Sequence, residues 1–141
     1  EEWGEDCLHQ FRGMFAFALW DEKKDKLFLA RDRLGIKPLY YTEIDGKFIF
    51  ASELKGILAS GLIRREIEPQ GLHHYLSFYS VPAPYTLIKG VKALPSGHKV
   101  IVEKGRVRIE KYWELEAYSP LQMKEEEIKE RLRELLEESI R

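Results

Sequence analysis

The chain has 141 residues, with 23 Lys and Arg against 24 Asp and Glu, a formal net charge of -1 and a single cysteine, Cys7. This balance provides no basic surface for nucleic acid or for an anionic membrane. The apolar runs are far shorter than the roughly 20 residues that cross a bilayer. One cysteine cannot form an internal disulfide and no secretory segment opens the sequence, so we expect a cytoplasmic protein.

The first third of the chain predicts paired strands. Residues 14–21 are apolar on both faces, which is typical of a strand buried between two layers. A charged turn and a second apolar segment, 26–31, complete an antiparallel hairpin. Residues 39–44 and 47–51 form another hairpin around Asp45-Gly46, a pair that favours a type I′ turn because both central residues need positive φ.

Two short helices follow these strands. Ser52 is a candidate N-cap and Glu53 suits the positive end of the helix dipole, and the apolar residues that follow repeat at helical spacing until Gly61. A second helix begins at Pro69, whose missing N–H costs nothing at a first helical position. Its apolar residues also repeat at helical spacing, and we expect both helices to lie on the sheet: Leu72, Tyr75 and Leu76.

The second half predicts one more hairpin and a trailing helix. Residues 99–102 and 106–112 are strands joined through Lys104-Gly105. From Lys124 the composition shifts to Glu, Lys, Arg and Leu with an apolar stripe at helical spacing. Because a plausible linker, Tyr118 to Pro120, precedes it, we interpret this helix as the first element of a further domain.

Few residues are arranged for catalysis or metal binding. Cys7 follows two carboxylates, which disfavour the thiolate that a nucleophile needs, so an inert thiol is the preferred interpretation. His73 and His74 are adjacent on a predicted helix and point about 100° apart, so they cannot share one metal ion. His9 and His98 are isolated, and no glycine-rich phosphate loop occurs. The chain also contains no asparagine.

The segment from Arg31 to Gly35, Arg-Asp-Arg-Leu-Gly, is the main candidate for a specialised loop. It places charged residues directly after a fully apolar strand, and buried charges need partners. Arg31 and Asp32 can lock a turn by pairing with neighbouring groups, with Gly35 supplying a positive φ. The residues alone leave a structural turn and a functional loop equally open.

Four motifs give the chain a specific resemblance to glutamine-dependent asparagine synthetases. They are Gly13 to Ala18, Arg31 to Tyr41, Ala51 to Lys55 and Leu94 to His98, with Ser96 standing where the family more often has proline or alanine. The resemblance identifies residues 1–117 as the later portion of a class II, N-terminal-nucleophile glutaminase domain. It identifies residues 118–141 as the linker and first helix of the ATP-pyrophosphatase, or synthetase, domain.

The resemblance implies an α+β fold: part of an αββα sandwich, with the antiparallel strands of this chain in one sheet and most of the partner sheet outside it. One face of the 14–21 strand is then uncovered, so we expect the isolated piece to be unstable, aggregation-prone or dimeric. The family's N-terminal cysteine nucleophile, its Asn-Gly oxyanion hole and its Ser-Gly-Gly-Leu-Asp-Ser pyrophosphate loop have no counterpart in these residues.

By this resemblance the segment holds no catalytic, cofactor or metal residue. ATP and Mg²⁺ belong to the full-length enzyme, whose substrates are glutamine and aspartate and which is a possible homo-oligomer. The segment is scaffold and part of an apolar ammonia conduit, for which Met14 and Ile36 match lining positions. The remaining motif residues are assigned to a turn and a helix cap: Arg31, Asp32, Gly35, Ser52 and Glu53.

Two other interpretations remain open. One is a free-standing, non-catalytic interaction or regulatory module that kept the strands of this family after losing catalysis. Another class II amidotransferase, with a different acceptor for the ammonia, is also compatible with the motifs. A simple core role for Met14 and Ile36 is the alternative to the conduit.

Overall fold

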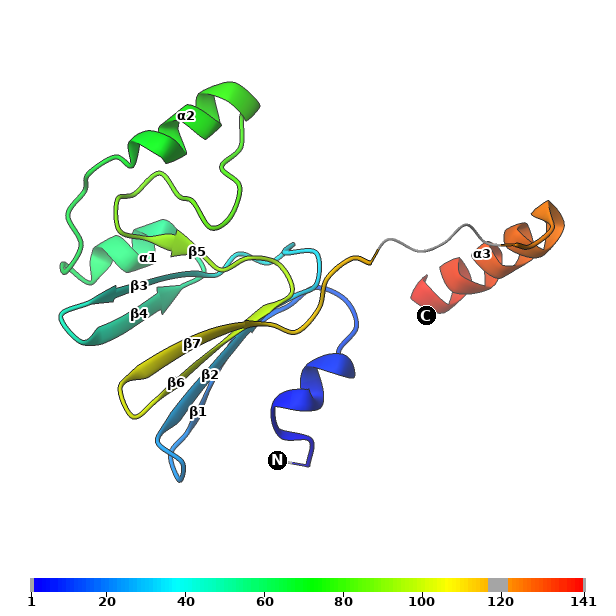
Figure 1. Cartoon of the computed structure of the whole chain (residues 1–141), viewed down its shortest axis with the longest axis horizontal. Helices are drawn as coiled ribbons and strands as arrows, with labels where there is room; N and C mark the ends of the chain where they lie inside the picture. Colours follow the sequence, from blue (N-terminus) through cyan, green and yellow to red (C-terminus); the bar gives the residue numbers. More distant parts are fainter. Residues whose placement is uncertain (1, 117–121, 141) are drawn as a thin grey trace.

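The computed structural model describes residues 2–116 and 122–140 (Figure 1). Antiparallel strands form two sheets with short helices around them, which confirms the α+β class. One sheet has the order β1-β2-β6-β7 and the other the order β4-β3-β5. In chain order the elements are η1 (Gly4–His9), β1 (Ala16–Asp21), β2 (Lys26–Arg31), β3 (Tyr40–Ile44), β4 (Lys47–Ala51), α1 (Leu54–Ala59), α2 (Pro69–Phe78), β5 (Lys92–Ala93), β6 (His98–Glu103), β7 (Arg106–Lys111) and α3 (Glu125–Ile140).

The three predicted hairpins are confirmed: β1 with β2, β3 with β4, and β6 with β7. Between β3 and β4, φ is 49° at Asp45 and 71° at Gly46, the two positive values that a type I′ turn requires. Lys104 and Gly105 repeat this geometry between β6 and β7, with φ of 50° and 71°. The turn residues therefore determine these local pairings.

The prediction of a single sheet is wrong, because the hairpins divide between two sheets. Strand β2 pairs with β6, placing Phe28 opposite Ile101. Strand β3 pairs with the two-residue strand β5, placing Tyr40 opposite Ala93. Alternating apolar residues indicate that a strand exists but not which distant strand joins it. Elements as short as β5 and η1 also contain too few residues for a periodic pattern.

The main apolar core lies where the two sheets face each other. Leu29 of β2, Val100 of β6 and Tyr41 of β3 belong to one buried cluster, which Leu39 and Leu94 complete. Away from the cluster, the hairpin ends of the two sheets diverge (Figure 1). The sheets are therefore packed together mainly at the end from which the loop after β2 emerges.

The other face of the larger sheet is covered by η1. Leu8 of this 3-10 helix is buried against Phe28 and Ala30 of β2 and Ile101 of β6. The layers are thus η1, the larger sheet and the smaller sheet, consistent with part of a sandwich.

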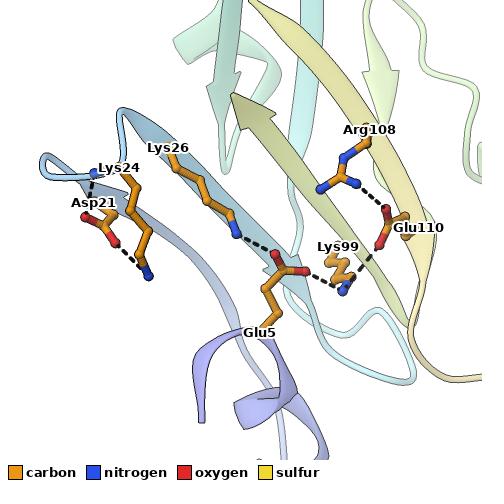
Figure 2. A network of polar contacts seen from close by, with 7 residues as sticks. All are labelled: Glu5, Asp21, Lys24, Lys26, Lys99, Arg108 and Glu110. Carbon is orange, nitrogen blue, oxygen red and sulfur yellow. Dashed lines mark hydrogen bonds and ion pairs between the residues drawn. The ribbon is translucent and has the colours of Figure 1, made fainter. Parts of the chain in front are cut away.

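A row of ion pairs also holds η1 to the larger sheet (Figure 2). Glu5 bridges Lys26 of β2 and Lys99 of β6, and Lys99 lies 3.3 Å from Glu110 of β7, which lies 3.7 Å from Arg108. Burial raises the pKa of Glu5, but hydrogen bonds from Lys26 and Lys99 outweigh burial and leave the pKa below its ordinary value of 4.5. The two lysine side chains are only 20% and 15% exposed, so water screens these contacts less than ordinary surface pairs.

We expect Glu5→Gln to destabilise the protein by about 1 to 2 kcal/mol at neutral pH, because charge-assisted hydrogen bonds to two part-buried ammonium groups are lost. Since the folded pKa lies below the ordinary 4.5, this contribution is complete above pH 4.5 and disappears as the pH falls through the folded pKa. Thermal unfolding of both proteins across this pH range measures the difference. Glu53→Gln, which removes an exposed pair with Lys55, is the control and should change little; equal effects would contradict the assignment.

Helix α1 lies on the β3–β4 hairpin, as expected. Ile57 is fully buried, and Gly61, with φ of 72°, follows the last turn. The predicted cap is wrong: the N-cap residue is Glu53, and no side chain accepts a hydrogen bond from the first turn. The chain stays extended through Glu53, so Ser52 lies outside the capping position.

Helix α2 begins at Pro69 as predicted but does not lie on a sheet. It packs against the loop that precedes β5: Gly71 is buried against Thr86, and the N–H of Glu68 donates to the carbonyl of Leu87 at 3.0 Å. The apolar residues expected to face the sheet are exposed instead: Leu72, Tyr75 and Leu76. Helical spacing identifies an apolar face but not what covers it.

Two apolar surfaces remain exposed in the described chain. Strand β1 is an edge strand without a fully buried residue: Ala16 and Phe17 are half-buried, and Leu19 and Trp20 are 53% and 57% exposed, so the predicted burial between two layers is wrong. Helix α3 confirms the predicted trailing helix, and its apolar stripe is exposed along its length. The predicted linker, Tyr118 to Pro120, lies outside the described residues. No helix among residues 2–116 and 122–140 is long and apolar enough to cross a membrane.

Candidate functional site

The loop after β2 is organised by the carboxylate of Asp32, which is only 1% exposed. Its Oδ1 accepts hydrogen bonds from the N–H groups of Leu34 at 3.1 Å and Ile36 at 3.0 Å. Its Oδ2 accepts from Lys37 at 2.9 Å and from Phe15, just before β1, at 3.3 Å. One buried side chain therefore fixes the loop and joins it to the chain entering β1.

The neighbouring residue, Arg31, binds the carbonyl groups of the same loop. Its guanidinium donates to the carbonyl of Gly35 at 2.6 Å, to that of Lys37 at 2.8 Å, and to that of Leu94. Asp32 thus accepts from loop N–H groups while Arg31 donates to loop carbonyls. Two adjacent side chains therefore satisfy backbone groups of a loop that forms no helix or strand.

Gly35 is required by this geometry. Its φ is 67°, a left-handed conformation in which side chains are disfavoured. A Cβ atom there would lie 3.1 Å from the Cβ of Ser96 and 3.2 Å from the Cζ of Arg31. The turn-locking arrangement expected for Arg31, Asp32 and Gly35 is therefore present, and it leaves a functional role of the loop open.

The charge of Asp32 is stabilised by its surroundings. Burial raises the pKa of its carboxyl group, but hydrogen bonds from the backbone, led by that of Lys37, outweigh burial and lower the pKa below 3.8. The hydroxyl of Tyr112 donates to the carbonyl of Arg31 at 2.8 Å. Burial, with a further contribution from the charge of Asp32, raises the pKa of Tyr112 to about 12. Near neutral pH the Asp32 carboxyl group is therefore ionised and the Tyr112 hydroxyl group is protonated.

Two conduit candidates flank this network. The N–H groups of Phe15, next to Met14, and of Ile36 both bind the Asp32 carboxylate. Met14 is 61% exposed and Ile36 is 55% exposed, and Leu34 on the same loop is 72% exposed. We call Met14, Leu34 and Ile36 the apolar residues around the Asp32 loop. Met14 precedes β1, and the other two lie on the loop itself. They are not core residues of the described chain, although the Asp32 carboxylate binds the N–H groups of Leu34, of Ile36 and of Phe15, which follows Met14.

Other candidates lie outside this network. Ser52 and Glu53 are exposed at the start of α1. Cys7 is half-buried in η1 against the apolar cluster that covers the larger sheet. The rings of His73 and His74 have centroids 6.0 Å apart on α2. Among the described residues, no group of three or more His, Cys, Asp or Glu side chains could hold a metal ion.

Sequence reasoning missed two contributors to the site. Gly97 donates its N–H to the carbonyl of Asp32 at 2.9 Å, and Tyr112 contacts Arg31 from 81 positions away. Gly97 belongs to a motif that was used only for its resemblance. Tyr112 carried no sequence signal, because nothing in a strand's apolar pattern indicates a hydrogen bond to a distant turn.

Comparison with known proteins assigns a family to this two-sheet α+β chain with its locked loop. A family model described as "Glutamine amidotransferase domain" matches residues 1–113. The chain belongs to this family.

The curated relatives of this chain include proteins named as asparagine synthetases and as an amidase. Asparagine synthetase [glutamine-hydrolyzing] 3 of Bacillus subtilis is 41% identical over 82% of this chain and 19% of the relative. A putative asparagine synthetase [glutamine-hydrolyzing] 2 of Methanocaldococcus jannaschii is 40% identical over 90% of this chain and 25% of the relative. Amidase chry2 of Gibberella zeae is 37% identical over 100% of this chain and 21% of the relative. The chain spans a quarter or less of the length of each.

Proposed function

We propose that this chain is a segment of a glutamine-hydrolysing asparagine synthetase, where it serves as scaffold and as part of the wall of an ammonia conduit. The observation that carries the proposal is the set of exposed apolar residues around the Asp32 loop, where neighbouring peptide groups are held by the buried Asp32 carboxylate and the half-buried Arg31 guanidinium. The relatives named asparagine synthetase support the identity of the parent enzyme. Its substrates are then glutamine, aspartate and ATP, and it acts in the cytoplasm.

An apolar wall suits the passage of ammonia. Transfer of NH4+ into an apolar passage costs far more free energy than transfer of neutral NH3, so the passage favours the nucleophilic form. Exclusion of water also protects NH3 from protonation before it reaches the acceptor. Side chains such as Met14 and Ile36 provide such a surface once a further part of the enzyme covers them.

The domain assignment follows the same proposal. Residues 1–117 are the later part of the glutamine amidotransferase domain, and the family match through residue 113 supports this boundary. Residues 118–141 lead into the synthetase domain, whose other helices would cover the exposed stripe of α3. The rest of the glutaminase sheets would likewise pair with the edge of β1. These two parts of the same polypeptide are the partners of this segment.

The chemical steps are assigned to residues outside this segment. The chain has no asparagine to supply an oxyanion-hole amide, and Cys7 is packed within η1. The described residues show no ligand cluster that fits Mg²⁺, so we assign no ATP or metal step to them. On this proposal the isolated segment neither hydrolyses glutamine nor forms asparagine.

We expect Met14→Asp in the full-length enzyme to uncouple its two reactions. A carboxylate in the conduit wall attracts water and protons, so ammonia escapes and glutamate exceeds asparagine by at least about twofold. Glutamate and asparagine formed per unit time are measured together, with glutamine as nitrogen source. Met14→Leu keeps the apolar surface and is the matched control, which should preserve equal amounts. Equal amounts in Met14→Asp would refute the conduit.

A second candidate is another amidotransferase or amidase, favoured by the match of the whole chain to Amidase chry2. This segment would then have the same scaffold role, but the parent enzyme would act on a different acceptor. Full-length enzyme supplied with glutamine, ATP and aspartate distinguishes the two candidates: asparagine formation supports the synthetase, and glutamine hydrolysis without asparagine supports the second candidate.

A further inference from the structure

We propose that Asp32 is a positioning residue that sets the geometry of the conduit wall by fixing two separate peptide groups with one carboxylate. This inference rests on the proposed function, since it concerns the same conduit. Asp32 is only 1% exposed and so has almost no surface with which to touch ammonia, and its effect therefore acts through Met14 and Ile36.

The two carboxylate oxygens have different tasks. Oδ2 accepts from the N–H of Phe15 at 3.3 Å, which fixes the peptide that joins Met14 to Phe15. Oδ1 accepts from the N–H of Ile36 at 3.0 Å, which fixes the peptide entering Ile36. The two wall positions are 22 residues apart in sequence, and this carboxylate holds a peptide group at each, with Arg31 also donating to the carbonyl of Gly35 in the peptide that enters Ile36.

An asparagine at position 32 cannot keep both attachments. Its amide has one oxygen acceptor, and its NH2 group is a donor that faces backbone N–H groups. If the oxygen takes the place of Oδ1, the contact to Ile36 survives and that to Phe15 is lost. The opposite orientation keeps Phe15 and loses Ile36. Either orientation releases one side of the wall, in a side chain of almost unchanged size.

The substitution also loses the bond from Leu34 or the bond from Lys37, but the surrounding network keeps the loop in place. The N–H of Asp32 still donates to the carbonyl of Phe15 at 2.8 Å, and its carbonyl still accepts from Gly97 at 2.9 Å. Arg31 still donates to the loop carbonyls of Gly35 and Lys37. The loop therefore keeps most of its contacts to the sheet, while the wall peptide that has lost its carboxylate acceptor is held less firmly.

The test uses full-length enzyme with Asp32→Asn. We expect the ratio of glutamate to asparagine to rise by about twofold or more, since small misplacements of positioning groups have large effects on coupled steps. Glutamine hydrolysis alone and asparagine synthesis from added ammonium should both stay within about twofold of wild type, because neither requires the conduit wall. A purely structural role would lower all rates in parallel and leave the ratio unchanged.

Asp21→Asn is the matched control. Asp21 also accepts two backbone hydrogen bonds, from Lys23 and Lys24 at 3.1 Å each, but in the turn between β1 and β2. Its substitution should leave the ratio unchanged, and a rise equal to that of Asp32→Asn would overturn the proposal. If Asp32→Asn gives no soluble enzyme, Asp32→Glu decides, because it keeps a carboxylate but moves both oxygens by one methylene from the N–H groups of Phe15 and Ile36; an unchanged ratio there overturns the proposal.

The outcomes separate this inference from the conduit itself. If Met14→Asp uncouples the reactions but Asp32→Asn does not, the conduit stands and the positioning role is wrong. If Met14→Asp leaves the ratio unchanged, the proposed function fails first.

Discussion

Replacing Gly97 with alanine should destabilise the protein by about 3 to 5 kcal/mol, the combined cost of a left-handed backbone and a severe overlap. The φ of Gly97 is 65°, and an added Cβ would lie 2.3 Å from the carbonyl oxygen of Trp113. The carbonyl of Gly97 also accepts the N–H groups of Tyr112 at 2.8 Å and Trp113 at 3.2 Å. Any shift that relieves the overlap therefore disturbs the contact between the Asp32 loop and the end of β7.

Gly105→Ala is the matched control for this prediction. Gly105 has φ of 71°, but nothing lies within 4 Å of an added Cβ. Its substitution has only the backbone cost, about 1 to 2 kcal/mol. Thermal and urea unfolding of the two variants in the full-length protein measures the difference, and equal losses would show that the overlap at Trp113 does not exist in solution.

Gly71→Ala is expected to displace α2 from its loop and to cost about 2 to 3 kcal/mol. An added Cβ would lie 1.9 Å from the backbone oxygen of Thr86, which flexible side-chain movement cannot relieve. The better helix propensity of alanine, about 1 kcal/mol, offsets only part of this cost. Proteolysis of the α2 region, compared with thermal unfolding of the whole protein, measures the local effect.

Gly56→Ala in α1 provides the comparison. There the nearest atom is the Ala51 methyl group at 3.0 Å, a side-chain contact that a small shift can accommodate. We expect a change within about 1 kcal/mol of zero, because helix propensity and crowding nearly cancel. If Gly71→Ala were as mild as Gly56→Ala, the close packing of α2 on the loop would be wrong.

The uneven success of the sequence predictions for the site has a physical cause. The loop from Arg31 to Gly35 was recognisable because charged residues directly after an apolar strand need buried partners. The identity of those partners was not recognisable, because most are backbone groups, and any residue but proline can offer the same N–H. Ser52 failed as a cap for a related reason: a capping residue type in sequence does not fix where the helix begins.

The sequence by itself determined the local structure: the three hairpins, the turns at Asp45-Gly46 and Lys104-Gly105, the helix start at Pro69 and the family to which the motifs point. These depend on interactions between residues close in the chain, which residue type and spacing encode directly. The tertiary structure alone decided that the hairpins form two sheets, that α2 packs on a loop, and that Asp32 joins the chain before β1 to the loop after β2. Those features depend on distant backbone groups that approach one another only in the folded chain, and no local pattern records them.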